Sequence, residues 1–359
     1  MNTGYVGKKK TIRFIDLFAG IGGFRYAMQN AGADLGMDVE CVFSSEIDQE
    51  CQRAYAENFG ETPHGDIKEI VAQDIPDHDI LLAGFPCQPF SIIGHMRGFD
   101  DTRGTLFFDI ARILAEKKPA AFVLENVKLL VGHSKGQTLS RILETLDELG
   151  YHTTYKVLNA LDFGLPQKRE RVFIVGFRSP CYFNWPNGNI PMRPLSEILE
   201  EDVPEEYFAS GHIRRKRLSK QKPTKEPTIW HENKAGHISA YPFSCALRAG
   251  ASYNYLLVNG ERRLTLREML RLQGFPEEAR IVCNYSQTRK QAGNSLPVPV
   301  AQAVIKNLVQ ATDWASTFSQ DETDKLVVDD QLRIFENTSK YDQNSETTDS
   351  PKVQATVPT

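Results

Sequence analysis

The chain has 359 residues, of which 41% are hydrophobic and 25% are charged, a size and composition that suit one large globular domain with a smaller one. It contains no run of 18 apolar residues, and its first ten residues carry charge with no apolar stretch behind them, which argues against a membrane span and a signal peptide. Six cysteines form no Cys-x-x-Cys pair and no His/Cys cluster, so we expect no metal site and a cytoplasmic location.

The formal net charge of −4 is unevenly distributed. Residues 313–359 contain ten acidic and four basic side chains, which leaves a charge of +2 for residues 1–312. The stretch from His212 to Lys225 contains seven Lys or Arg residues and no acid. Such a run is a candidate phosphate-contacting surface, but it is equally typical of a solvated helix face.

Residues 11–178 alternate short apolar runs with helical stretches, which is typical of a parallel sheet covered by helices. The predicted strands are 12–17, 40–44, 80–83, 121–124 and 172–177. The predicted helices of this part are 23–31, 107–117 and 137–149. The pattern therefore favours an α/β fold with a doubly wound, mostly parallel sheet.

Prolines interrupt this alternation after Ser179, and helical spacing returns at 264–273 and 298–310. We interpret the chain as a first part at 11–184, an inserted loop-rich domain at 185–264 and a returning part of the first domain at 265–312. The polar tail 313–359 is expected to be disordered.

A nucleoside site is predicted along one sheet edge. Phe18 to Phe24 form a glycine-rich turn between the first strand and a helix, Glu46 follows the second strand, and Asp66 follows the third segment. Glycines allow close backbone approach to a ligand, and a carboxylate can accept hydrogen bonds from both ribose hydroxyls. This pattern alone does not choose between a nicotinamide and a sulfonium cofactor.

A reactive cysteine is suggested at the same edge. Cys87 lies between Pro86 and Gln88-Pro89 after an apolar strand, and Glu125 ends the next strand. A lone cysteine is more often a small buried apolar residue, and a strand-end Glu is often a cap or an ion-pair residue. Arg169 and Arg171 lead into the strand at 172–177, where alternation puts both on one face. Two neighbouring arginines there can hold a phosphate or lower the pKa of a nearby thiol, but they are equally typical of a structural salt-bridge ladder.

Taken together, these segments resemble the bacterial DNA (cytosine-5)-methyltransferases, the modification enzymes of restriction-modification systems. The resemblance covers residues 11–178 and about 235–310, and is carried by ordered motifs at 16–24, 84–91, 125–127, 167–171, 271–276 and 291–295. It implies a Rossmann-like, S-adenosylmethionine-dependent methyltransferase fold whose inserted domain recognises the target sequence.

The resemblance also implies roles for the reactive residues. Cys87 would add to carbon 6 of cytosine, and Glu125 would protonate ring nitrogen 3. Arg169 would orient the base through its carbonyl oxygen, and Arg171 would support the cysteine loop and the glutamate. The cytosine would be flipped out of the duplex, with residues 90–106 closing over it.

S-adenosyl-L-methionine is the implied methyl donor. The residues implied to surround it are Phe18, Gly20, Gly23, Glu46, Asp66, Pro86, Leu106 and Asn294. Ile47 occupies the position where some relatives carry a tryptophan stacked on the adenine, and an aliphatic contact would serve there.

Double-stranded DNA is the implied partner, bound by an expected monomer that protects sites cut by a cognate restriction endonuclease. Base readout is expected within residues 185–251, with His231, Asn233 and Lys234 as candidate base readers, although each fits an ordinary loop surface equally well.

Three alternatives stay open. A tRNA cytosine-5 methyltransferase of the same family shares the Pro-Cys-Gln core, but Phe85 and Phe90-Ser91 favour DNA. A nicotinamide oxidoreductase does not account for Cys87 and Glu125 together. A DNA-binding module without catalysis does not account for the full set of reactive residues.

Overall fold

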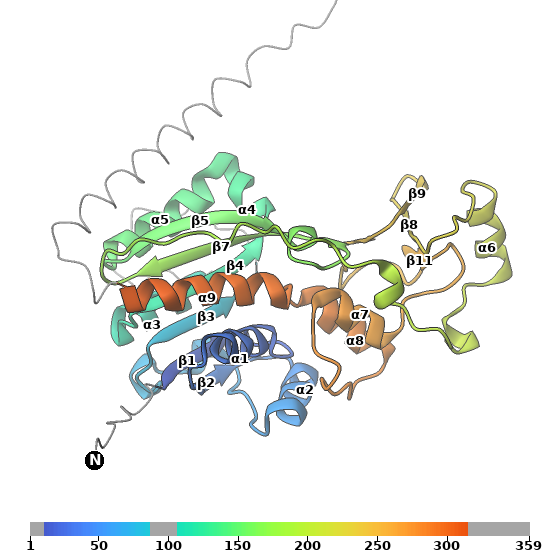
Figure 1. Ribbon diagram of the computed structural model, residues 1–359. Helices are drawn as coiled ribbons and strands as arrows, with labels where there is room; N and C mark the ends of the chain where they lie inside the picture. The colour runs from blue at the N-terminus through green and yellow to red at the C-terminus, as the bar shows by residue number, and fades with distance from the viewer. Residues whose placement is uncertain (1–10, 87–105, 315–359) are drawn as a thin grey trace, which may run out of the picture.

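The computed structural model describes residues 11–86 and 106–314. Its centre is a six-stranded sheet with the strand order β2-β1-β3-β4-β7-β5 (Figure 1). The strands are β1 (Ile12–Leu17), β2 (Val39–Ser45), β3 (Ile80–Gly84), β4 (Ala121–Val127), β5 (His152–Asn159) and β7 (Glu170–Phe177). Strands β1 to β4 run parallel, and β7 runs antiparallel to both β4 and β5. The doubly wound, mostly parallel sheet predicted from the sequence is confirmed.

Helices cover both faces of this sheet and create two apolar cores. The helices are α1 (Gly23–Leu35), α3 (Leu106–Lys117), α5 (Gln137–Glu148) and α9 (Val298–Trp314). One core joins Leu82 and Val123 to α1 and α9, and the other joins Leu81 and Phe122 to α3 and α5. Successive strand residues point to opposite faces, so a strand buried on both faces is apolar throughout. This burial explains the continuous apolar runs of β3 and β4.

Shorter elements complete the described chain. The helices are α2 (Gln49–Phe59), α4 (Leu129–Gly132), α6 (Gly211–Leu218), α7 (Leu266–Gln273) and α8 (Tyr285–Asn294). The strands are β6 (Gln167–Lys168), β8 (Ile229–Glu232), β9 (Ile238–Tyr241), β10 (Ser244–Cys245) and β11 (Leu256–Val258). Figure 1 shows α6, β8, β9 and β11 gathered at one end of the molecule, with α7 and α8 between them and the main sheet.

Helix α2 and strand β5 were among the elements that were not predicted. Helix α2 buries only Ala54 and Tyr55, so its sequence lacks a clear apolar stripe. Strand β5 lies at the sheet edge and buries only Leu158, so it lacks the apolar run of a central strand. The last helix packs against α1 and extends to Trp314, four residues beyond the helix end predicted at 310. Within the described ranges, no helix is long and apolar enough to cross a membrane.

Candidate active site

The glycine turn after β1 is fastened to the end of β2 by the carboxylate of Glu46. Phe18 and Gly20 adopt left-handed backbone, each with φ of 57°. The Gly20 N–H donates to Glu46 Oε2 at 2.8 Å, and the Asp48 N–H donates to Oε1 at 2.8 Å. Burial raises the pKa of Glu46, and the N–H groups of Asp48 and Gly20 oppose that rise. Each carboxylate oxygen retains a lone pair, so Glu46 can still accept bonds from two ribose hydroxyls.

The same turn lies against the segment that follows α8. A Cβ added at Gly23 would lie 3.1 Å from Ser295 Oγ and 3.1 Å from Leu296 Cγ, so glycine permits this close approach. Asn294 directly precedes Ser295 and is exposed. The fold therefore brings Gly23 and Asn294, from opposite ends of the described chain, to one place.

Asp66 lies beside the same edge of the sheet. The Glu46 N–H donates to the carbonyl of His64 at 2.8 Å, which draws this segment alongside the end of β2. The Asp66 side chain accepts the Lys68 N–H at 3.0 Å and so caps a short 3-10 helix. Ile47, next to Glu46, is 68% exposed. An exposed apolar side chain next to a carboxylate with free lone pairs can contact the face of a base.

Helix α3 is connected to this segment from its other side. Arg112 of α3 donates to the carbonyl of Ile67. Leu106 begins α3 and packs, half-buried, against the core on that face of the sheet. The structure thus brings together the glycine turn after β1, Glu46 after β2, the Asp66 segment and the end of α8, and it connects α3 to the Asp66 segment through Arg112.

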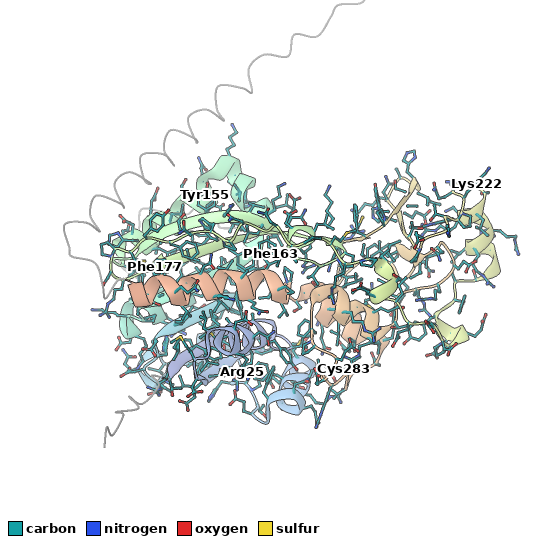
Figure 2. All side chains as sticks on the ribbon, in the orientation of Figure 1. Arg25, Tyr155, Phe163, Phe177, Lys222 and Cys283 are labelled. Carbon is teal, nitrogen blue, oxygen red and sulfur yellow. The ribbon has the colours of Figure 1, made fainter. Side chains whose placement is uncertain are left out.

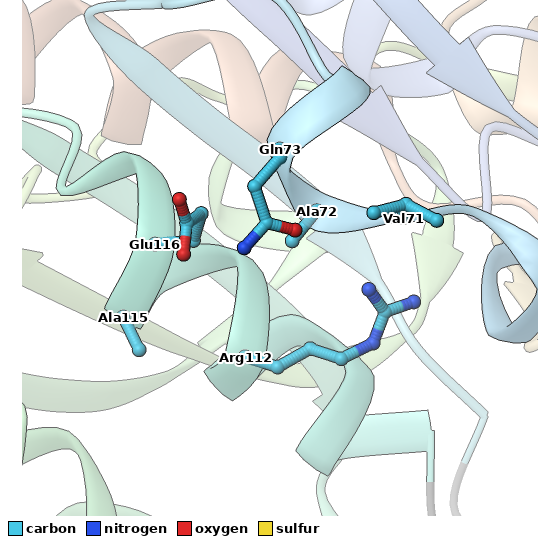
Figure 3. A pocket seen from close by; sticks show the side chains of 6 residues that line it. All are labelled: Val71, Ala72, Gln73, Arg112, Ala115 and Glu116. Atoms are coloured by element: carbon cyan, nitrogen blue, oxygen red, sulfur yellow. The ribbon is translucent and has the colours of Figure 1, made fainter.

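A separate surface cavity of about 410 Å³ lies between α3 and the segment at residues 71–73 (Figure 3). Val71, Gln73, Arg112 and Glu116 are among the residues that line it. None of the residues predicted for the cofactor or for catalysis lines this cavity.

The catalytic edge begins where β3 and β4 end side by side. Gly84 of β3 lies opposite Glu125 of β4, and a Cβ at Gly84 would lie 3.6 Å from Glu125 Oε2. The buried Asn126 donates to the carbonyl of Phe85 at 2.9 Å. This bond fixes the backbone that leads through the exposed Pro86 to Cys87. Cys87 itself, and the rest of the loop predicted to close over the base up to residue 105, lie outside the described residues.

Glu125 and Arg171 form an ion pair at this edge. Arg171 Nε lies 2.9 Å from Glu125 Oε1, and both side chains are largely buried. Burial raises the pKa of Glu125, while the charges of Arg171 and Arg169 oppose the rise. A carboxyl group whose pKa is raised holds a proton more readily near neutral pH. The arrangement suits a side chain that donates a proton to a substrate.

Arg169 occupies a different position from Arg171. It is 1% exposed, and its guanidinium donates to the carbonyls of Leu247 at 3.0 Å, of Gly293 at 3.0 Å and of Ser295. Burial, and then the charge of Arg171, lowers the pKa of Arg169 to about 9. Arg169 lies just before β7 and Arg171 lies within it, and only Arg171 forms an ion pair with Glu125.

Two buried glutamines extend this set of contacts, although sequence reasoning assigned them no role. Gln167 accepts the Leu247 N–H at 3.1 Å and donates to Leu272 O at 2.8 Å and to Gln273 Oε1 at 3.2 Å. Gln273 donates to Ala292 O at 2.5 Å. The one sequence feature that could have identified them is that they lie inside the family motifs at 167–171 and 271–276. Together with Arg169 they join the start of β7 to the segment after β10 and to the end of α8.

The basic run at 212–225 is partly used within the protein. Lys216 and Arg217 both pair with Glu232 at 2.9 Å, and Lys220 donates to Gly236 O at 3.0 Å. These bonds hold α6 against the β8–β9 hairpin. Arg217 is fully buried, whereas Lys222 lies at the outer edge of this end of the molecule (Figure 2).

The three candidate base readers differ in their contacts. Asn233 accepts the N–H groups of Ala235 and His237, so its side chain shapes the hairpin turn. The His231 ring meets the Tyr255 ring edge to face. Lys234 is exposed.

In the described ranges, no group of three or more His, Cys, Asp or Glu side chains could hold a metal ion.

The chain is similar in sequence to several DNA-modifying enzymes. The family described as C-5 cytosine-specific DNA methylase matches residues 12–310. The chain is 58% identical over 297 residues to the Type II methyltransferase M.NgoBI of Neisseria gonorrhoeae, covering 81% of this chain and 91% of the relative. It is 55% identical over 310 residues to M.HaeII of Haemophilus aegyptius, covering 86% and 96%. M.HhaI of Haemophilus parahaemolyticus is 42% identical over 320 residues, covering 83% and 94%.

Solved structures share the fold at lower identity. The Dnmt2 methyltransferase of S. pombe matches with a TM-score of 0.64 and 20% identity, covering 84% of this chain and 99% of that one. A putative DNA modification methyltransferase encoded within an E. coli prophage matches with a TM-score of 0.66, 20% identity and the same coverage. With the family match over residues 12–310, the sequence relatives identify the chain as a member of the C-5 cytosine-specific DNA methylases, an enzyme that methylates carbon 5 of cytosine in DNA.

Proposed function

We propose that Cys87 is the nucleophile of this reaction and that Glu125 and Arg171 bind the target cytosine. The observation that carries the proposal is the Glu125–Arg171 ion pair, which stands beside the strand end that delivers Cys87. Carbon 5 of cytosine is a poor nucleophile, so a thiolate must first add to carbon 6. Asn126 supports this step by holding the carbonyl of Phe85, one residue before Pro86.

Glu125 then supplies the proton that the ring needs. As the Cys87 sulfur bonds to carbon 6, ring nitrogen 3 takes a proton from Glu125, and an enamine forms that is nucleophilic at carbon 5. Once carbon 5 carries the methyl group, it loses its proton to a base, and the bond from Cys87 to carbon 6 breaks. The raised pKa of Glu125 favours the protonated form that this step requires.

The contacts lead us to divide the arginines differently from the expectation drawn from the sequence. Arg169 donates to three backbone carbonyls, so we propose that it positions the start of β7 and does not bind the base. Arg171, paired with Glu125, takes over the role of orienting the cytosine carbonyl oxygen. Arg is suited to this place because its planar fork contacts two acceptors at once.

S-adenosylmethionine supplies the methyl group when it is bound. We propose that Glu46 holds its ribose, that Ile47 contacts its adenine and that Asp66 accepts from the adenine amino group. The remaining residues proposed to surround it are Phe18, Gly20, Gly23, Pro86, Leu106 and Asn294. The glycine turn that Glu46 fastens, and the exposed Ile47 beside it, support this placement.

The substrate is double-stranded DNA, bound by a monomer in the cytoplasm. Since carbon 5 is not accessible in a stacked duplex, the cytosine must be flipped out of it. Residues 185–264 act as the target-recognition domain between the two parts of the catalytic domain, 11–184 and 265–312. The Type II relatives favour a role in protecting DNA from a restriction endonuclease that recognises the same site.

Trapping on a fluorinated substrate tests the chemistry. A duplex with 5-fluorocytosine at the target should become covalently bound to the protein in the presence of S-adenosylmethionine, because fluorine replaces the carbon 5 proton and cannot leave as a cation, so that the bond from Cys87 to carbon 6 does not break. Cys87→Ser should abolish the trapped complex, and Cys181→Ser is the matched control that should retain it. Trapping that survives Cys87→Ser would overturn the assignment.

Base-resolved methylation mapping of DNA from cells that express the chain gives the target site. Unmodified DNA together with methylated tRNA would instead favour the RNA alternative.

A further inference from the structure

The segment between β10 and β11 follows a strand that pairs with β6, the short strand that leads into β7. Ser244 and Cys245 of β10 pair in parallel with Gln167 and Lys168 of β6. Two residues later, the Leu247 N–H is accepted by Gln167 and its carbonyl is held by Arg169. The next residue along, Arg248, therefore starts from a backbone position fixed relative to Arg171 and Glu125.

Arg248 is exposed, and its guanidinium is held on one face only. Its Cζ lies 4.9 Å from the centroid of the Tyr255 ring, and its backbone N–H donates to the Tyr255 hydroxyl at 2.9 Å. Tyr255 is 7% exposed and so forms a fixed platform. Among the described residues, no acid lies within ion-pair distance of Arg248. Stacking on a ring leaves the edge donors of a guanidinium available.

Other cations of this end of the molecule are used internally. Lys216 and Arg217 pair with Glu232, and Arg289 lies over Tyr253 and donates to Ala251 O. Arg263 lies over the Tyr285 ring. Arg248 differs because the buried Tyr255 ring holds it close to β6, while its side chain forms no hydrogen bond or ion pair with any other described residue.

We propose that Arg248 reads a guanine close to the target cytosine, donating two hydrogen bonds to O6 and N7 in the major groove. An arginine that reads base edges needs a fixed stem and free edge donors, and a bidentate contact to guanine is the commonest specific contact of this side chain. The inference rests on the proposed function, since it places this guanine beside a cytosine held by Glu125 and Arg171. It adds a residue that determines target specificity.

The test compares Arg248→Ala and Arg248→Lys with Arg215→Ala, an exposed arginine of α6 for which the structure shows no side-chain bond. Each protein methylates a duplex library with random bases around the target cytosine, at one salt concentration, and methylation is measured at base resolution. The wild type should require guanine at one position. Arg248→Ala should methylate those sites about 10- to 100-fold more slowly and lose the preference at that position alone. Arg215→Ala should lower the rate equally at all sites, as a phosphate contact does.

Arg248→Lys separates charge from geometry. Lysine keeps the charge but cannot reproduce the planar fork, so it should restore little of the preference. Full recovery of the guanine preference by lysine, or an equal loss at all sites for Arg248→Ala, would overturn the proposal. Trapping of Arg248→Ala on 5-fluorocytosine in its preferred sequence is measured in parallel. If the wild type is not trapped, the proposed function is wrong. If the wild type is trapped but Arg248→Ala keeps the guanine preference, only the role of Arg248 is wrong.

Discussion

The Nη2 atom of Arg169 donates to the carbonyl of Gly293 at 3.0 Å, although the two residues are 124 positions apart in the sequence. The same guanidinium reaches Leu247 and Ser295. One buried side chain thus connects three separate segments around the catalytic edge.

Arg169→Ala should destabilise the fold. Each buried carbonyl that loses its donor costs about 1–3 kcal/mol, so the free energy of unfolding should fall by about 3 kcal/mol or more. Urea unfolding measures the change. Arg141→Ala is the control, because Arg141 pairs only at the surface with Glu144 and Glu148 and should change the value by less than about 0.5 kcal/mol. A loss for Arg169→Ala no larger than that of the control would contradict the structural role.

Arg171→Lys should impair catalysis more than folding. Lysine keeps a charge near Glu125 but lacks the planar fork that can contact Glu125 and the cytosine carbonyl oxygen at once. The methylation rate in a single turnover should therefore fall about 10- to 100-fold, while the unfolding midpoint changes little. Arg178→Lys, just beyond the other end of β7, changes the same side chain at the surface and should leave the rate unchanged. An Arg171→Lys enzyme as fast as the wild type would remove Arg171 from the site.

Asp16 predicts a pH dependence of stability. It is fully buried at the end of β1, and burial raises its pKa well above 3.8, with the charge of Arg25 opposing the rise. A raised folded-state pKa means that the protonated form is favoured in the native state. Below about pH 4 both folded and unfolded forms are protonated; as the pH rises towards the folded-state pKa, ionisation increasingly favours unfolding.

The side chain introduced by Asp16→Asn does not titrate. The free energy of unfolding of this variant, relative to that of the wild type, should therefore rise as the pH increases above about 4. Urea unfolding of both proteins over a pH series measures this difference. Asp38→Asn, at an exposed carboxyl group, is the comparison that should show no such trend. A difference between Asp16→Asn and the wild type that stays constant over the series would contradict the prediction.

Ile47 should contribute to cofactor affinity. Replacing it with serine removes apolar surface worth roughly 1–1.5 kcal/mol, so the Kd for S-adenosylmethionine should rise about 10-fold in calorimetry without DNA. Ile190→Ser changes another exposed isoleucine, 56% exposed and on a different part of the surface, and should leave the Kd unchanged. Equal Kd values for the two variants would place the adenine elsewhere.

The sequence predicted the sheet because its central strands are apolar on both faces; the bounds of β1 agree at both ends. Alternation alone could not separate Arg169 from Arg171, since it puts both on one face, and the family resemblance assigned the base to Arg169, whereas the contacts favour Arg171. Their difference depends on the antiparallel register of β4 and β7, in which Arg171 faces Val127, two residues beyond Glu125. It also depends on the path of residues 247 and 293–295, which no local pattern encodes. Arg248 was missed for the same reason, because its platform, Tyr255, follows seven residues later in an irregular segment.

Gln167 and Arg169 hold the segment after β10 by its main chain, through the N–H and the carbonyl of Leu247. Every residue type except proline offers both groups at such a position. The attachment therefore imposes almost no demand on the identity of the side chains in this segment. If Arg248 reads a base as proposed, substitutions in this segment should change the target sequence of the enzyme while the reacting groups stay in place.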